Sequence, residues 1–516
     1  MRAKFKTVGI PILFILLFVG ALFFQQLLQV KEQPHPDWSR SIPFDYTSDE
    51  RPLVFSGEEG LFLASKGSVT QFTFNEFLDA KKVKTLHTSV TRGKPFWTDG
   101  SRVIQIKDDQ LTSTESGEVK IIAEEVTGIS TSSKNVYYWN KEHLYSLNTK
   151  DLSVKEIHRF SNEIMDAYIG ETGSAIVQVK QDDTHSLLHY MDADRNIIEQ
   201  PFAVVNTATN QHISGLTFSD DNKQLTILYN EEMRAQGTLS YKIFKLKTPL
   251  DEIGSSILKP AQVVFTNEMS GFKLQSPRSV QLAIIKGKES ILFTSESHRV
   301  GDQNAVSLYL APFSDSTQLA AAPIGTTKHF TYSPLQITDE SILWLDYGGD
   351  YYELFGASQN DQVIAKSTEW SKRSVKEAVN DGVLMLFSSL LTILVSFYWV
   401  LPSLFILILL YMFKPNIFEK EGIIWVEYAS IILFLAMPFT FISKAMGDYF
   451  YFSAPEYLTF SGSKYVSLFL IGALSALIWK WGRDKDWGTF GGAFYFMGIY
   501  ILLYVALIGP YIFNLF

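Results

Sequence analysis

Long apolar segments at both ends of the chain constrain its fold more than any other feature. Near the N-terminus, MRAKFK precedes an apolar run with no small-residue cleavage site after it, so we interpret residues 8–28 as an uncleaved signal anchor. In the last quarter, residues 383–413 are interpreted as one long helix kinked at Pro402. Three further runs of spanning length follow at 423–442, 465–479 with its flanks, and 490–513. The sequence therefore predicts five transmembrane helices.

Basic residues beside these segments predict their orientation, because short cytoplasmic connections are enriched in Lys and Arg. Residues 1–30 would then form a cytoplasmic N-terminus and the anchor. Residues 371–516 would form the other four helices, and their cytoplasmic loops carry Lys414, Lys420, Lys480, Arg483 and Lys485. A basic group at 372–376 lies on the outer side, but it follows a large domain, where the rule is weak. We therefore expect residues 31–370 to be extracytoplasmic, in a multi-pass protein of a bacterial cell membrane.

Composition excludes several classes of site and partner. The 516 residues are enough for two or three domains. The sequence has no cysteine, which excludes disulfides, thiolate zinc sites and cysteine nucleophiles. Its net charge of −9 gives no support for nucleic-acid binding, which usually needs a basic surface. We therefore expect the lipid bilayer as a partner and no nucleic acid.

The segment between the apolar runs is predicted to be all β and repetitive. Residues 40–370 show no helical periodicity, and short alternating strands are separated by Gly, Asp and Asn. Units of strand, turn, strand, turn and strand begin at Leu53, Val103, Val136, Ala175, Leu225, Ile291 and Ile342. Several of these units are preceded by a further short strand, which gives four strands in each.

This pattern, seen for example in FSDDNKQLTIL, resembles the repeats of β-propeller proteins of the WD40 and quinoprotein-like kind. The seven starts are on average about 48 residues apart, close to the roughly 40–50 residues of a four-stranded blade. The resemblance implies an all-β propeller of about seven four-stranded blades, joined to α-helical membrane segments. It transfers no functional residue, because neither the Trp-Asp dipeptide nor the Gly-His pair recurs. Six or eight blades, or a pair of β-sandwiches, are the alternatives.

Motifs for catalysis or metal binding do not occur in the sequence. It has no nucleophile elbow, phosphate-binding glycine loop or H-E-x-x-H pattern, so we name no catalytic, cofactor-binding or metal-ligating residue and expect no cofactor. On a strand, His185 and His189 would be about 13 Å apart, too far to share one ion. The run from Asp192 to Asn196 lacks the other ligands of a calcium loop and is interpreted as a hairpin turn.

Two candidate sites belong to the predicted membrane helices. Glu427 is the only acidic residue inside a predicted span, which makes it a possible functional residue, although pairing with a basic residue of a cytoplasmic loop is the simpler interpretation. Gly488 and Gly492 have a spacing that permits close helix packing. A possible domain-coupling loop contains five aromatic residues, for which an interfacial belt is the simpler interpretation: Tyr449, Phe450, Tyr451, Phe452 and Tyr457.

These features predict a membrane-tethered extracytoplasmic propeller without catalysis of its own. It would bind a protein or cell-envelope ligand through its loops, as a scaffold, assembly factor or sensor. One alternative is a hydrolase that acts on an envelope polysaccharide or peptide at the mouth of the propeller channel. Another is a membrane sensor or transporter component that uses the C-terminal helices.

Overall fold

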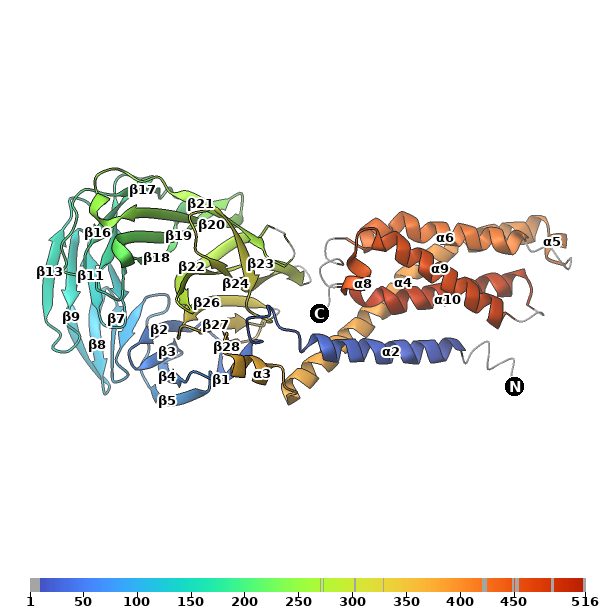
Figure 1. Ribbon diagram of the computed structural model, residues 1–516, viewed down its shortest axis with the longest axis horizontal. Coiled ribbons are helices and arrows are strands. Elements are labelled where there is room, and N and C mark those ends of the chain that lie inside the picture. Colours follow the sequence, from blue (N-terminus) through green and yellow to red (C-terminus); the bar gives the residue numbers. More distant parts are fainter. Residues whose placement is uncertain are drawn as a thin grey trace. The chain divides into compact units, whose positions relative to one another are not determined.

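The computed structural model describes residues 10–513 apart from 270, 272, 301–302, 328, 420–424, 448–449, 451–453 and 484–486. The chain divides into two compact units, and each is described by itself (Figure 1). The helical unit comprises Met1–Glu32, His298–Asn304 and Glu369–Phe516, and the β unit comprises Gln33–Ser297 and Ala305–Thr368.

Among its described residues, the helical unit contains four helices that are long and apolar enough to cross a membrane, which fits a membrane protein. The predicted single long helix is confirmed as α4, which starts with a Ser371 capping box and continues through Pro402. At the N-terminus, the described apolar helix Leu16–Gln29 is shorter, so the fifth span stays a prediction. The helices of this unit are α2 (Ile10–Gln29), α4 (Lys372–Phe413), α5 (Asn416–Glu419), α6 (Trp425–Ala445), α8 (Glu456–Thr459), α9 (Ser463–Gly482), α10 (Thr489–Leu507) and the 3₁₀ turn η4 (Gly509–Tyr511).

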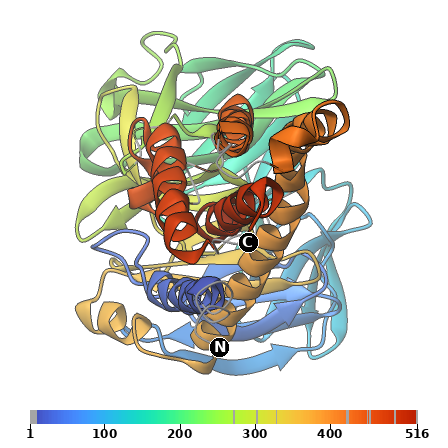
Figure 2. The same cartoon turned by 90° about the vertical axis from the view of Figure 1, so that its right-hand side faces the viewer.

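Small hydroxyl residues of α4 are buried, while many of its large apolar side chains are exposed, which is the reverse of a helix in water. Ser388 Oγ donates a hydrogen bond to the carbonyl of Gly509 at 2.7 Å, and Ser403 Oγ donates to that of Ser430 at 2.8 Å. Small buried hydroxyl residues let helices approach closely and bond across their interface. Leu394, in contrast, is 68% exposed, as expected of a side chain that contacts lipid. Figure 2 shows the long helices of this unit gathered into a bundle.

The β unit starts with four separate antiparallel sheets of four strands, each a meander in chain order. In the first three, the last strand is largely exposed and the second is mostly buried, so the meander leads from the core to the surface. The strands are β2 (Leu53–Gly57), β3 (Gly60–Ser65), β4 (Ser68–Phe74), β5 (Ala80–Leu86), β6 (Phe96–Thr98), β7 (Arg102–Lys107), β8 (Gln110–Glu115), β9 (Glu118–Ala123), β10 (Gly128–Thr131), β11 (Val136–Asn140), β12 (His143–Leu147), β13 (Val154–Arg159), β14 (Ile164–Ile169), β15 (Ala175–Lys180), β16 (His185–Met191) and β17 (Ala203–Asn206).

The remaining twelve strands form one connected sheet with three groups of four. Parallel pairings of β21 with β25 and of β24 with β26 connect these groups. The last group takes its fourth strand from the other end of the unit, because β1 pairs with β28 and Ile42 lies opposite Gly356. The strands are β18 (Gln211–Ser219), β19 (Gln224–Ala235), β20 (Thr238–Pro249), β21 (Ala261–Asn267), β22 (Gln275–Ile285), β23 (Lys288–Val300), β24 (Gln303–Pro312), β25 (Gln318–Pro323), β26 (Phe330–Gln336), β27 (Ser341–Tyr347), β28 (Tyr352–Ser358) and β1 (Ile42–Ser48), and helix α3 (Asp361–Ser367) follows β28.

Six of the seven predicted repeat starts fall on the second strand of a group, but the first start is wrong by one strand. Leu53 opens β2, the first strand of its sheet, and the equivalent position is Leu61 in β3. The tight turn at Glu58–Glu59 looks in the sequence like the turn at Asp108–Asp109, which follows a second strand. Alternation with period two cannot distinguish successive strands of a meander.

Hydrophobic clusters connect each group of strands to the next. One cluster contains Phe62, Ile104 and Tyr138 from the first three sheets. Another contains Leu63 of β3 and Leu345 of β27, so the last group packs against the first. Four further clusters each contain residues of two consecutive groups, for example Trp139 and Val177, Ile176 and Ile227, Leu228 and Phe293, and Leu292 and Trp344.

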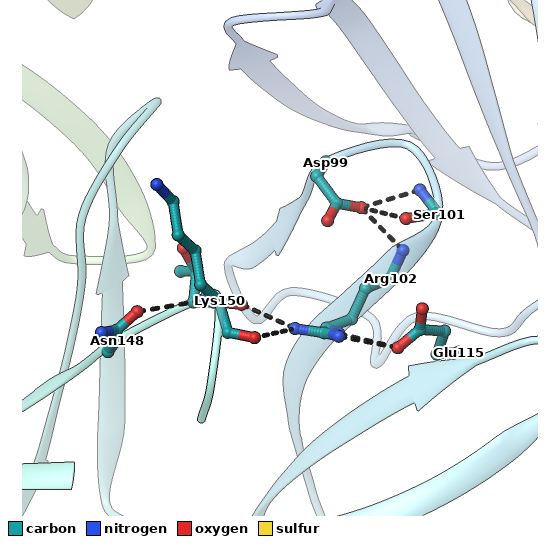
Figure 3. Close-up of polar contacts among 7 residues, drawn as sticks. Asp99, Ser101, Arg102, Glu115, Asn148 and Lys150 are labelled. Atoms are coloured by element: carbon teal, nitrogen blue, oxygen red, sulfur yellow. Dashed lines mark hydrogen bonds and ion pairs between the residues drawn. The ribbon is translucent and has the colours of Figure 1, made fainter. Parts of the chain in front are cut away.

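A polar contact also links neighbouring sheets at Arg102 in β7 (Figure 3). Its guanidinium pairs with Glu115 of the same sheet at 2.8 Å and donates to the carbonyl of Thr149 in the β12–β13 turn at 2.6 Å. Asp99 Oδ1 accepts hydrogen bonds from the backbone N–H groups of Ser101 and Arg102, both at 2.8 Å. Burial alone would raise the pKa of the Asp99 carboxyl, but these hydrogen bonds offset burial and lower the pKa.

Candidate functional site

Glu427 lies in the first turn of α6, where the positive end of the helix dipole favours a carboxylate. Its side chain is almost fully buried and pairs with Arg483, which follows the last residue of α9: Oε2 and Nη2 are 2.7 Å apart. The guanidinium of Arg483 also lies 5.2 Å from the ring centroid of Trp479 in α9. The indole N–H of Trp479 donates to the carbonyl of Gly492 at 2.9 Å. These four residues therefore connect one end of α6, α9 and α10.

Gly492 makes room for the carboxylate. A Cβ at this position would lie 1.9 Å from Glu427 Oε1, so a larger residue and the observed side chain cannot coexist. The same oxygen has no hydrogen-bond donor among the described residues. Within the described part of the chain, the site is therefore a carboxylate with one paired oxygen and one buried oxygen that accepts no hydrogen bond. The spacing of Gly488 and Gly492 in the sequence predicts only close helix packing.

The candidate coupling loop is described only in part. Tyr449, Tyr451 and Phe452 lie outside the described residues. Phe450 is 1% exposed in the core of the helical unit, with its ring 6.3 Å from that of Tyr511. Tyr457 is 59% exposed and its hydroxyl donates to Gln25 Oε1 at 3.3 Å. Phe450 is therefore engaged inside its own unit, and a coupling role for this loop stays a prediction.

In the β unit, three tyrosines and Arg51 meet from distant segments, and the charge of Arg92 acts on the same group, which is not among the predicted sites. The rings of Tyr347 and Tyr352 stack with centroids 4.6 Å apart, and the ring of Tyr332 lies 5.9 Å from that of Tyr352. The guanidinium of Arg51 lies 4.6 Å from the Tyr332 centroid. Burial raises the pKa of the Tyr352 hydroxyl, while the positive charges of Arg51 and Arg92 oppose the rise. We call these five residues the Arg–Tyr cluster.

The backbone that carries the two arginines is anchored. Arg51 follows a turn in which the hydroxyl of buried Ser48 donates a hydrogen bond to the carbonyl of Glu50 at 2.7 Å. The Nη2 of Arg51 donates to Ser333 Oγ at 3.1 Å. Ser333 has a φ of +48° within a bulge of β26. Such bulges redirect side chains and are frequent next to functional sites.

The β5–β6 connection that carries Arg92 is fixed by a buried amide. Gln105 Nε2 donates to the carbonyl of Ser89 at 2.8 Å, and its Oε1 accepts from the N–H of Thr91 at 2.8 Å. In an antiparallel meander, the connection to the next sheet and the turn between the second and third strands lie at the same end. The same end of the sheets therefore carries three segments of the Arg–Tyr cluster: the β1–β2 connection, the β5–β6 connection and the β27–β28 turn.

A partly buried carboxyl, that of Asp166, lies on β14, the first strand of the fourth sheet. Burial raises the pKa of Asp166, partly opposed by a hydrogen bond from the N–H of Ala167 at 2.9 Å, by Tyr168 and by the charge of Lys94. Burial also raises the pKa of Tyr168, and the charge of Asp166 adds to this rise. A carboxyl with a raised pKa is better suited to act as a general acid than an ordinary aspartate.

The remaining sequence candidates have structural partners. His185 bonds to the turn residue Asp182, while His189 packs against Phe160 with ring centroids 5.3 Å apart. The run from Asp192 forms a hairpin turn, in which the N–H of Asn196 donates to Asp192 Oδ1 at 2.8 Å. No group of three or more His, Asp or Glu residues in the described part of the chain is arranged to hold a metal ion.

Comparison with known proteins gives weak similarities only. No protein-family model matches the sequence, and a search of curated proteins found no match. Among solved structures, the tricorn protease matches with 12% identity and a TM-score of 0.33 over 58% of this chain and 32% of that one. The extracellular domain of a one-component system from B. thetaiotaomicron matches with 11% identity and a TM-score of 0.36, over 61% and 40%. A chain of the mitotic checkpoint complex matches with 10% identity and a TM-score of 0.36, over 61% and 90%.

The chain thus spans well under two thirds of the length of the first two of these structures. At such identities and TM-scores, the similarities assign no activity, substrate or partner to this chain. The functional argument therefore rests on the chain's own residues.

Proposed function

We propose that residues 31–370 form a β-propeller of about seven four-stranded blades. The strand pairings support this, because the four separate sheets and the three groups of the connected sheet all contain four strands. The hydrophobic clusters support it too, because they lead from group to group and return from β27 to β3. Completion of the last group by β1 is the closure that a ring of blades requires, since each blade must bury both faces.

The membrane arrangement is part of the same proposal. Residues 1–30 hold a cytoplasmic N-terminus and a signal anchor, and residues 371–516 hold four transmembrane helices. The propeller lies between them on the extracytoplasmic side of a bacterial cell membrane. The inverted polarity of α4 supports the spanning role of this helix, and the distribution of basic residues supports the orientation.

The function that this geometry supports best is binding. The protein acts as a scaffold, assembly factor or sensor and holds a protein or cell-envelope ligand at the loop end of its blades. The Arg–Tyr cluster carries this proposal, because tyrosine and arginine on rigid backbone dominate the energetics of many interfaces. Neither Arg51 nor Arg92 forms an ion pair within the part of the chain that the structure describes, so both charges are available to a ligand.

Protease accessibility tests the topology. Protease added to intact cells, or to spheroplasts if an outer membrane is present, is expected to remove the β unit and leave protected helical fragments. A β unit that resists this treatment and is degraded only after permeabilisation would refute the extracytoplasmic placement.

Photo-crosslinking in native membranes tests the binding function. Photoreactive residues at several loop positions are expected to form discrete adducts with one ligand. Their complete absence, together with turnover of a glycan or peptide by the purified protein, would refute binding in favour of catalysis.

The hydrolase remains the second candidate because of Asp166. Burial raises the pKa of this carboxyl, and on a first strand it would lie at the wall of the central channel in a propeller, where an envelope polysaccharide or peptide substrate would need a general acid. Loss of a measured hydrolytic activity in Asp166→Asn, with unchanged thermal stability, would support this function. Retention of activity would exclude Asp166 as the acid.

A further inference from the structure

We propose that the Arg–Tyr cluster binds an acidic segment of a partner protein. This inference rests on the binding function proposed above and names its surface and the chemical class of its partner. It starts from the charge of the cluster within an acidic chain. The protein carries a net charge of −9, yet this surface presents Arg51 and Arg92 without a carboxylate partner among the described residues.

The environment of each arginine favours a planar anionic group. The Arg51 guanidinium is held over the ring of Tyr332, and one of its nitrogens donates a hydrogen bond to Ser333. A fixed guanidinium keeps its remaining donors in a fork that fits a carboxylate with two parallel hydrogen bonds. Arg92 supplies a second charge from the connection anchored by Gln105, so a segment with two or more acidic residues fits better than a single anion.

The tyrosines decide between a protein and a polysaccharide. A sugar ring is usually recognised by stacking on an open aromatic face. Here Tyr347 and Tyr352 cover one face of each other, and Arg51 covers one face of Tyr332. Tyr351, which is 47% exposed beside this stack, adds a side chain that can contact the rim of a protein interface. Tyrosine and arginine anchors beside an exposed rim are typical of protein interfaces, so the occupant that we propose is an acidic protein segment.

Site-specific photo-crosslinking in the full chain, in native membranes, tests this inference. A benzophenone amino acid at Tyr351 is expected to form one discrete protein adduct, and the crosslinked partner peptide, mapped by mass spectrometry, is expected to contain acidic residues. A probe at Val119, which is 62% exposed on the outer strand β9, serves as the control and is expected to form none.

Binding of the synthetic partner peptide to the purified full chain then tests the residues. Arg51→Ala and Arg92→Ala are each expected to weaken binding about tenfold, as loss of an interface arginine commonly does. Lys66→Ala is the matched control at the same end, because Asp49 already neutralises Lys66. Replacing Asp and Glu of the peptide by Asn and Gln is expected to weaken binding comparably.

Three results would overturn the inference: an adduct at Tyr351 that contains polysaccharide, a peptide affinity unchanged by either arginine substitution, or no adduct at Tyr351. A probe at Gln236, exposed in the β19–β20 turn at the same end, separates the two proposals. An adduct at Gln236 without one at Tyr351 refutes this surface and leaves the binding function standing. No adduct at either position counts against both.

Discussion

Replacing Gly492 with alanine is expected to break the ion pair between Glu427 and Arg483. A Cβ at position 492 would lie 1.9 Å from Glu427 Oε1 and 2.7 Å from its Cδ. Non-bonded atoms in contact are roughly 3.5 Å apart, so the carboxylate would have to move by more than about 1 Å. Glu427 is 1% exposed, which leaves it no space to do so without leaving Arg483.

Two effects of opposite sign set the size of the change. Alanine is better than glycine inside a helix by about 1 kcal/mol. Breaking a buried ion pair costs about 3–5 kcal/mol, and the lower value applies because the Arg483 side chain is 26% exposed. The free energy of unfolding is therefore expected to fall by about 2 kcal/mol. Gly498→Ala is the control on the same helix, because a Cβ there meets no atom within 4 Å.

Unfolding of the full chain in mixed detergent micelles measures these differences. In a Glu427→Ala background the obstacle is absent, so Gly492→Ala is expected to become neutral or stabilising. A double-mutant cycle isolates this coupling between the two positions. The reasoning is refuted if Gly492→Ala and Gly498→Ala agree within about 0.5 kcal/mol, or if the penalty persists without Glu427.

Three further predictions concern the β unit. Gly128→Ala places a Cβ 2.0 Å from the Trp139 ring and is expected to cost about 1–3 kcal/mol in thermal unfolding, whereas Gly215→Ala, with no atom within 4 Å, is expected to cost far less. A lysine at position 102 cannot bond to Glu115 and the carbonyl of Thr149 at the same time, as the guanidinium of Arg102 does. In Arg102→Lys, amide hydrogen exchange in β7 and β12 is therefore expected to become faster, by an amount that corresponds to a loss of about 1 kcal/mol in local opening free energy. Unchanged exchange would contradict this. The lowered pKa of Asp99 means that its contribution to stability is present above its unfolded pKa of about 4 and is lost as pH falls through the folded value. In Asp99→Asn, the free energy of unfolding is therefore expected to fall less steeply as the pH is lowered below about 4. An unchanged pH dependence would exclude this role for Asp99.

The sequence predicted the features of this fold that depend on neighbouring residues. Apolar runs identified α4 with its internal Pro402, and alternation with polar turns identified the four-strand groups. The position of a strand within its group is a tertiary property, which is why the unit at Leu53 was displaced by one strand. Pattern alone cannot show that β2 lies first in its sheet while β7 lies second.

The candidate sites depended even more on contacts between distant segments. Arg51 reaches Ser333 across 282 positions of sequence, and no local pattern connects them. The turn YGGDYY, which holds Tyr347 and Tyr352, was a visible signal, because aromatic residues crowd a hairpin turn that needs none for its geometry. The charge of Glu427 inside an apolar run identifies it as a candidate in the sequence. Only the packed helices show that Arg483 is its partner and that Gly492 leaves the space for its carboxylate.

Because β1 pairs with β28, the β unit cannot complete its folding until β28 has been synthesised. Ile42 leaves the ribosome early, but Gly356, its partner, is synthesised only after almost the whole β unit. At synthesis rates of roughly 5–20 residues per second, β1 stays without its partner for about 15–60 s. An unpaired strand edge is prone to pair wrongly during such an interval. The first strand of this protein is therefore the segment most in need of protection while the chain is being made.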